Sequence, residues 1–427
     1  MTSYQALSKE ELQNELARVN ALLDEAKSRR LHLDMSRGKP GKEQLALSMD
    51  MLCDLKSIDD MMEGAVDTRN YGVLAGLPSA KALFADLLDT KPENVFIGGN
   101  ASLQLMYDLI AKAYTHGLLH SPSPWSHRGT VRFLCPSPGY DRHFRISENF
   151  GMEMIPIAMT ENGPDMDMIE QWIKDPSVLG MWCCPKYSNP DGIVYSDETL
   201  SRIASLRPAA PDFTIIWDNA YCVHEIEGDY VPFPDILSLC AKHGNPDMVF
   251  EFASTSKITF PGAGISCMVS SKENIDHMTK LIGVQTIGYD KINQLRHVRF
   301  LKDKANTLRL MKRHAALLKP RFDIVLKLLD REITPLQIAN WTRPKGGYFV
   351  SLYAMNGTAK RTLELASEAG VTMTGAGATY PYGKDPFDSN IRIAPSVPSI
   401  EELEQAMSIL CLCLRCSALE QLLKAAS

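Results

Sequence analysis

The chain contains 427 residues, which exceeds the usual size of a single hydrophobic core and predicts two structural units. Its 45 basic and 51 acidic side chains give a net charge of -6, which argues against a surface built to bind nucleic acid or membranes. The N-terminus is too charged for a signal peptide and no apolar run looks long enough to span a bilayer, so the sequence predicts a cytoplasmic protein.

The first 30 residues have the pattern of an amphipathic helix. Apolar residues recur at helical spacing from Leu12 to Leu23, and Ser8 and Glu11 form a capping-box pattern at its start. The segment SRGKP at 36–40 then reads as a loop, because glycine and proline interrupt regular structure. We assign residues 1–48 to an N-terminal helix and loop that join the smaller structural unit.

From residue 94 to about residue 271, short apolar runs alternate with helical stretches. Runs such as VRFLCP, GMWCCP, FTIIWD and MVFEFAS are typical of buried strands. The alternation predicts an α/β fold, a mostly parallel sheet flanked by helices, with its ligand at the carboxyl ends of the strands. A helical stretch from about 290 to 329 follows. We place a large domain at 49–320 and a small C-terminal α+β domain at 321–427.

Ten cysteines are scattered along the chain, often among apolar residues. This pattern indicates reduced core residues in a reducing compartment rather than a disulfide framework. Cys411, Cys413 and Cys416 cluster in a helical stretch, but they lack the paired spacing and the histidines of a zinc site. We therefore predict helix packing there and no bound metal.

Lys257 follows one of the predicted strands, in the segment FASTSK. The hydroxyls of Ser254 and Ser256 could hold a phosphate, while the lysine amine could reach an aldehyde. Taken alone, a lysine flanked by serines is more often a solvated loop residue. Its interpretation therefore depends on what the other strand ends carry.

Asp218 ends the strongly apolar strand FTIIWD, where a carboxylate is costly unless it meets a cation. A protonated pyridine nitrogen is such a cation, and the carboxylate would keep the ring of pyridoxal phosphate able to accept electrons. Tyr221, three residues on, could donate its hydroxyl to the phenolate oxygen of that cofactor. A helix N-cap or a metal ligand is the alternative for Asp218.

Two further strand ends carry polar groups. Asn189 precedes Pro190, so we expect an extended conformation that ends the strand, with an amide free to donate to the phenolate oxygen. The run GGN at 98–100 leads from a strand into a helix that begins near Ala101 and Ser102, and free N–H groups at a helix N-terminus bind phosphate. An ordinary turn is the alternative at both places.

Together these motifs resemble those of the class I aminotransferases of pyridoxal-phosphate fold type I. In chain order the matching patterns are GGN at 98–100, PGY at 138–140, NPDG at 189–192, DNAY at 218–221, STSK at 254–257 and NIR at 390–392. The resemblance covers about residues 31–410 and is more specific than any single motif, because six patterns recur in the family's order. SRGKP and the segment SKITFPGAG at 256–264 are most similar to the divergent bacterial aspartate aminotransferase branch.

The resemblance implies a role for each matched residue. Lys257 would form the Schiff base with the cofactor and carry the proton, and Asp218 would pair with the pyridinium nitrogen. Asn189 and Tyr221 would donate to the phenolate oxygen, and Tyr140 would stack on the ring. The residues implied around the phosphate are Asn100, Ala101, Ser102, Ser254, Ser256 and, from the other subunit of a homodimer, Tyr71.

The same resemblance implies the substrate contacts. Arg392, with Gly38 and Asn189 beside it, would bind the α-carboxylate of the substrate. A second cation would select dicarboxylates, and we favour Arg37 and Arg142 for it, with solvated surface charge as the alternative. The resemblance thus implies transamination between aspartate and 2-oxoglutarate by a ping-pong mechanism.

One position departs from the family. Most class I members have an arginine eight residues after the lysine, where this chain has Ile265, so the phosphate must be held in another way. Two other readings stay open. One is a different reaction on the same fold, such as β-elimination, decarboxylation or transamination of aromatic or kynurenine-type donors. The other is a cofactor-binding regulator, for which the first 30 residues are too short to supply a helix-turn-helix.

Overall fold

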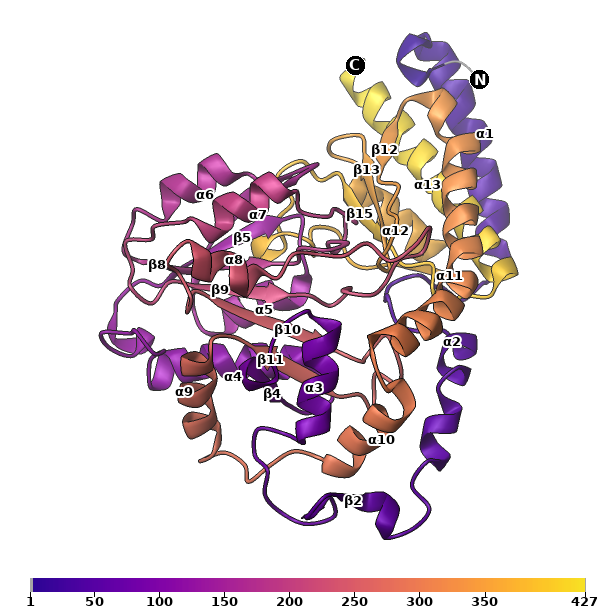
Figure 1. The fold of residues 1–427 in the computed structure, drawn as a ribbon. Coiled ribbons are helices and arrows are strands. Elements are labelled where there is room, and N and C mark those ends of the chain that lie inside the picture. Colours follow the sequence, from indigo (N-terminus) through magenta and orange to yellow (C-terminus); the bar gives the residue numbers. More distant parts are fainter. Residues whose placement is uncertain (1–2, 427) are drawn as a thin grey trace.

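The structure, a computed structural model, describes residues 3–426 and contains a central sheet of eight strands (Figure 1). Its strands are β4 (Val95–Ile97), β5 (Arg132–Ser137), β6 (Glu153–Thr160), β7 (Gly163–Pro164), β8 (Val178–Cys183), β9 (Thr214–Asp218), β10 (Val249–Ser254) and β11 (Ser266–Val269). The spatial order is β4-β11-β10-β9-β8-β5-β6-β7. The five strands from β10 to β6 run parallel, whereas β11 and β7 are antiparallel to their neighbours.

Helices connect these strands, as the sequence predicted. They are α2 (Lys42–Ala46), α3 (Pro78–Leu87), α4 (Ser102–Thr115), α5 (Asp141–Asn149), α6 (Met166–Trp172), α7 (Asp197–Ala204), α8 (Ile236–Lys242), α9 (Lys272–Ile282) and α10 (Lys291–Leu301). A two-stranded hairpin, β2 (Met62–Glu63) and β3 (Val66–Asp67), precedes α3. The predicted α/β architecture with a mostly parallel sheet is confirmed.

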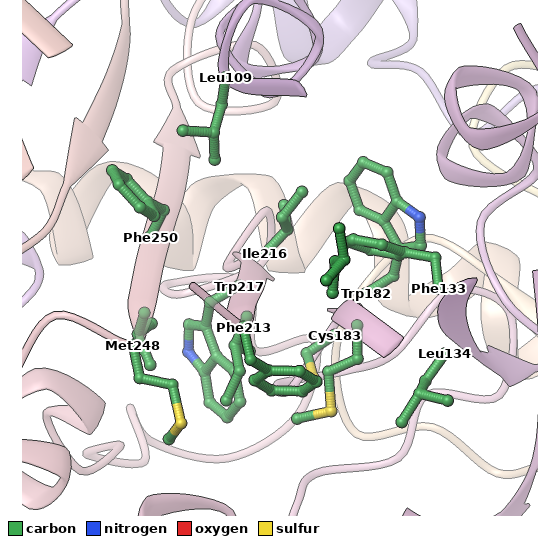
Figure 2. Close-up of a cluster of buried hydrophobic side chains, with 14 of the residues drawn as sticks. Leu109, Phe133, Leu134, Trp182, Cys183, Phe213, Ile216, Trp217, Met248 and Phe250 are labelled. Carbon is green, nitrogen blue, oxygen red and sulfur yellow. The ribbon is translucent and has the colours of Figure 1, made fainter. Parts of the chain in front are cut away.

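Side chains from neighbouring strands fill the two faces of this sheet (Figure 2). Ile216 and Phe250 lie on the face that Leu109 of α4 covers, whereas Trp217 points to the opposite face. Successive residues of β9 therefore alternate between two buried faces, as expected for a strand covered by helices on both sides. Because the interior of this sheet is closely packed, its strands are held firmly, and so are the residues at their ends.

The smaller unit combines both ends of the chain (Figure 1). Its helices are α1 (Lys9–Ser28), the C-terminal part of α11 (Lys304–Glu332), α12 (Ala359–Glu368) and α13 (Ile400–Ala425). Its antiparallel sheet contains β12 (Ala339–Trp341), β13 (Val350–Ala354) and β15 (Asn390–Ile393), and β1 (Leu33–Asp34) pairs with β14 (Val371–Thr372). The capping box of Ser8 and Glu11 is present, and α1 packs along α13.

The helical stretch expected from about 290 to 329 is two helices rather than one. Lys302 adopts a φ of 64°, which ends α10, and the Asp303 side chain then accepts from the backbone N–H of Asn306 to begin α11. The N-terminal part of α11 packs in the core of the large unit and its C-terminal part in the core of the small unit. We therefore propose domain boundaries near residues 48 and 320, with α11 crossing the second.

Among the described residues, α13 is the one helix long and apolar enough to cross a membrane by length and composition, a feature that our sequence analysis overlooked. The protein itself buries 67% of that apolar window, against α1, α11 and α12. Cys411 and Cys413 are part of this buried face, and burial raises the pKa of Cys411 to about 12. No group of three or more potential metal ligands lies within residues 3–426.

Candidate active site

The carboxyl ends of three parallel strands carry the polar residues that the sequence singled out. Asp218 is the last residue of β9, Lys257 lies three residues beyond β10, and Asn189 lies six residues beyond β8. These strands are neighbours in the sheet, so their ends meet at one edge. Arg392 comes from β15 of the small unit and reaches Asn189, which places the site between the two units.

Lys257 is only partly exposed, and its amine lies among aromatic rings. The Nζ atom lies 5.1 Å from the ring centre of Tyr221 and 6.0 Å from that of Tyr348. Burial lowers the pKa of Lys257, and the negative charge of Asp218 opposes that shift. The amine is therefore easier to deprotonate than an ordinary lysine, as a nucleophile or base requires.

Asp218 is buried, with a relative exposure of 3%, and its two carboxylate oxygens differ. The Oδ2 atom accepts a hydrogen bond of 2.9 Å from Nε2 of His143, whose ring stacks on Trp182 at 4.4 Å between centres. The Oδ1 atom is buried without a hydrogen-bond partner. A buried carboxylate oxygen without a partner is costly, so this atom is suited to a cationic ligand such as a protonated pyridine nitrogen.

Tyr221 and Tyr140 provide the aromatic surroundings of this carboxylate. Burial raises the pKa of Tyr221, so its hydroxyl stays protonated and can donate a hydrogen bond. Burial also raises the pKa of Tyr140 to about 12, and its ring contacts that of His143 edge to face at 5.0 Å. Tyr140 is the residue before α5, whereas His143 lies within its first turn, so one helix end holds both rings.

The segment around Asn189 differs from our expectation. The strand β8 ends at Cys183, and the chain turns at Tyr187, whose φ is 52°, before it reaches Asn189. Asn189 therefore lies six residues beyond the strand and does not end it as we predicted, and its peptide bond to Pro190 is cis. Its Oδ1 atom accepts from Arg392 over 3.2 Å, which leaves the amide nitrogen as the group able to donate to a cofactor.

Arg392 is buried and has several partners. Its Nη1 atom donates to Asp141 over 3.0 Å as well as to Asn189, and its Nη2 atom donates to Thr374 over 3.1 Å. Its Nε atom is buried without a partner, and Phe349 packs against the guanidinium at 4.8 Å. This is not the solvated surface ion pair that a lone arginine more often forms.

Gly38 lies against the same phenylalanine. A Cβ atom on Gly38 would lie 2.5 Å from the ring of Phe349, which is closer than real Cβ contacts come. The N-terminal loop therefore approaches the surroundings of Arg392, and only glycine allows that approach. This is the position from which we expected Gly38 to contact a substrate carboxylate.

The expected phosphate turn also comes together. Ser254 donates to Ser256 over 3.1 Å, and Ser256 donates to the backbone oxygen of Asn100 over 3.3 Å. The helix α4 begins at Ser102 with Ala101 as its N-cap, so its free N–H groups lie next to these hydroxyls. Serine hydroxyls beside a helix N-terminus are chemically suited to a phosphate dianion.

The structure explains why an arginine is absent at position 265. Ile265 is buried in the core of the large unit, so its side chain points away from the turn. The next residue, Ser266, is directly opposite Ser254 in the sheet and donates to the backbone oxygen of Gly99 over 2.8 Å. In this chain Ser266, one position after the site of the usual cation, braces the turn, and it was not singled out from the sequence.

Four residues of the sequence-based site are exposed, and Asn100 of the phosphate turn is one of them. Arg37 and Arg142 lie at the surface in loops or helix ends, and Tyr71 has a relative exposure of 82%. Arg142 contacts Asp141 at 3.9 Å. The single chain therefore does not bring the two arginines and Tyr71 to Lys257, and their roles stay predictions.

Besides Ser266, sequence reasoning missed several partners of the site, among them His143, His224 and Asp141. His143 lies three residues after Tyr140, a spacing that places it near the same helix end, and this was its only signal in the sequence. His224 packs edge-on against Tyr221 at 5.6 Å, and burial lowers its pKa. The lowered pKa favours the neutral ring, which packs against Tyr221.

This fold, with its site at the carboxyl edge of the sheet, is that of the fold-type I pyridoxal-phosphate aminotransferases. The sequence pattern of the family described as Aspartate amino-transferase matches residues 7–426, and the chain belongs to this family. Resemblance in sequence to its relatives extends over nearly the whole chain, as the following comparisons show.

The chain is 47% identical over 426 residues to a Mycolicibacterium smegmatis protein that bears an aminotransferase name, and the match covers 99% of each chain. It is 44% identical over 402 residues to an aspartate aminotransferase of Corynebacterium glutamicum, covering 94% of this chain and 93% of that one. The crystal structure of an aspartate transaminase from Corynebacterium glutamicum superimposes with a TM-score of 0.96 at 43% identity, covering 98% of this chain and 99% of that chain. These relatives support aminotransferase activity for this chain.

Proposed function

We propose that the protein transfers the amino group of aspartate to 2-oxoglutarate with pyridoxal phosphate as its cofactor. The observation that carries the proposal is the buried carboxylate of Asp218, which His143 holds on one oxygen while the other oxygen has no partner. The choice of aspartate is supported by the 44% identity to an aspartate aminotransferase.

The residues of the site fit this cofactor. Lys257 would hold its aldehyde carbon, Asp218 its ring nitrogen, and Tyr221 with Asn189 its phenolate oxygen. Tyr140 would cover the ring. The phosphate would lie against the start of α4 and the two serine hydroxyls, with the residues Asn100, Ala101, Ser102, Ser254 and Ser256 around it.

When bound, the cofactor supplies an electron-accepting ring that makes a proton on the substrate's α-carbon acidic. The chain itself must then move that proton. The amine of Lys257 is suited to take it, because burial lowers its pKa and makes it easier to deprotonate than an ordinary lysine. The same amine could return the proton at the carbon of the cofactor that carried the aldehyde. Lys257 would then act first as a base and then as an acid.

A residue of the small unit, Arg392, would orient the substrate. Arg392 offers a planar donor pair to an α-carboxylate, and Asn189 and Thr374 fix the plane of its guanidinium. Arg37 and Arg142 are our candidates for the second carboxylate of aspartate, because each lies next to residues of the site. We further propose a cytoplasmic homodimer in which the exposed Tyr71 reaches the partner's phosphate site, which its exposure in the single chain supports.

Two measurements test the proposal. Purified protein incubated with pyridoxal phosphate, aspartate and 2-oxoglutarate should form oxaloacetate, and efficient turnover of an aromatic donor with none of aspartate would refute the substrate assignment. Lys257→Ala should lose the visible absorbance of the lysine-bound cofactor and turnover together. Lys257 is partly exposed, so its replacement should leave the thermal unfolding temperature close to that of the wild-type protein. This measurement is the control for correct folding.

A further inference from the structure

The carboxylate of Asp141 lies between two arginines of the proposed substrate site. Its Oδ1 atom accepts from Nη1 of Arg392 over 3.0 Å, and its Oδ2 atom is 3.9 Å from Nε of Arg142. Asp141 is the first residue of α5 and directly follows Tyr140. One acidic side chain thus faces both cations that we assign to the two carboxylates of the substrate.

Arg392 is shielded from water, so its partners matter. Its side chain has a relative exposure of 7%, whereas that of Asp141 is 25%. The other partners of the guanidinium, Asn189 and Thr374, are neutral. Within residues 3–426, Asp141 is therefore the acidic side chain that pairs with this arginine.

A carboxylate ligand would meet a site that already contains a carboxylate. If it binds at Nη1 of Arg392, it replaces the ion pair with Asp141 instead of adding a new one. The free energy gained on binding is therefore smaller. If both carboxylates stayed at the arginine, like charges would repel across a short distance in a buried setting. Both routes weaken the binding of any ligand that depends on Arg392.

We propose that Asp141 determines the affinity of the site for carboxylates by competing with the substrate for Arg392. The proposal rests on the proposed function, since it takes Arg392 as the residue that binds the α-carboxylate. A displaced Asp141 keeps contact with water and with Arg142, because a quarter of its side chain is exposed. The competition therefore acts on ligands with a carboxylate and leaves ligands without one unaffected.

The test uses Asp141→Asn in the enzyme loaded with pyridoxal phosphate. Asparagine keeps the size and one acceptor oxygen of aspartate but removes the charge. The dissociation constants of succinate and aspartate, followed by calorimetry and by the visible absorbance of the cofactor, should fall ~10-fold, the effect of about one charge-assisted hydrogen bond. Methylamine, an amine without a carboxylate, should bind with unchanged affinity.

Further variants separate the possible outcomes. Asp141→Glu keeps the charge and should bind succinate as weakly as the wild-type protein, and Glu148→Gln removes an exposed acid from the same helix and should change nothing. Unchanged or weaker succinate binding by Asp141→Asn would overturn the proposal, because Asp141 would then merely hold Arg392 in place.

Failure of the underlying function would look different. If Arg392→Lys binds succinate and aspartate as the wild-type protein does, Arg392 is not the carboxylate site, whatever Asp141 does. If Arg392→Lys weakens binding and Asp141→Asn does not strengthen it, only the competition by Asp141 is wrong. In steady-state kinetics the competition predicts a lower KM for aspartate in Asp141→Asn with kcat within a few-fold of the wild-type value.

Discussion

Two walls of the site are built in different ways. The first, which we call the strand-end wall, consists of Asp218, Asn189 and Arg392, all of them buried. The second, which we call the loop wall, is the proposed set of Arg37, Arg142 and Tyr71, all of them exposed in the single chain. The end of β9, the segment after β8 and strand β15 hold the first wall, whereas loops and a helix end carry the second.

The difference follows from the cost of burying polar groups. A buried carboxylate or guanidinium needs partners within the same chain. His143 therefore donates to Asp218, and Arg392 donates to Asn189 and Thr374. Exposed arginines are solvated and need no such partners. We therefore expect the loss of a buried group of the first wall to reduce turnover more than the loss of an exposed arginine of the second wall.

The largest effect should come from the charge of Asp218. Asp218→Asn keeps the size but leaves a ring nitrogen without its anion, and we expect kcat to fall ~100- to 1000-fold, the scale of breaking a buried ion pair. Steady-state kinetics with aspartate would measure this. Asp247→Asn is a matched control, because Asp247 also pairs with a histidine, His120, but in an exposed place. A similar loss in both variants would contradict the special role of the strand-end wall.

The second largest loss of activity is expected when the histidine that donates to Asp218 is replaced. His143→Phe keeps an aromatic ring over Trp182 but removes the donor to Asp218, and we expect kcat to fall ~10- to 100-fold, as for a lost hydrogen bond to a charged group. The visible spectrum of the bound cofactor should shift as well, which a loss of packing alone would not cause. An unchanged spectrum and rate would show that Asp218 keeps its place without His143.

Replacing an arginine of the loop wall should change the KM for aspartate. Arg142→Gln removes one candidate cation for the side-chain carboxylate, and we expect KM for aspartate to rise ~10-fold with kcat little changed, because an exposed pair contributes only modestly. Arg145→Gln, an exposed arginine on the same helix, is the matched control. If both variants behave like the wild-type protein, Arg37 or a residue of the partner subunit supplies the cation.

The smallest effect concerns a carboxyl behind the strand-end wall. Glu251 of β10 is buried and accepts from Asn219, the residue after Asp218, over 2.7 Å. Burial raises the pKa of Glu251 from 4.5 to about 8. The folded state therefore favours the neutral acid, and its contribution to stability is complete below pH 4.5 and is lost as the pH rises through about 8.

Glu251→Gln removes this ionisation. We expect the variant to unfold ~2 °C higher than the wild-type protein at pH 9 and at nearly the same temperature at pH 5, a shift typical of ~1 kcal/mol in a large domain. Thermal unfolding at the two pH values measures it, with Glu153→Gln at the surface as the control. An equal shift at both pH values would mean that the difference in unfolding temperature comes from packing and not from the ionisation of Glu251.

Much of the site could be predicted from the sequence. Lys257 and Asp218 each follow an apolar run with strand character, and the rule that ligands lie at the carboxyl ends of parallel strands brought them together. The start of α4 near Ala101 and Ser102 was predicted from the glycine pair before it and is confirmed. These signals are local, since each depends on residues that are neighbours in the chain.

The sequence thus determined, by local pattern, the order of strands and helices and which polar residues end the strands. Only the tertiary structure decided which charges meet: Arg392 pairs with Asp141 although 251 positions separate them, and His143 meets Asp218 across 75. It also decided that Ile265 packs in the core, that two helices replace one around Lys302, and that the apolar helix α13 is covered by the protein itself. Such contacts depend on how distant segments fold against each other, and the spacing of residues along one segment carries no record of them.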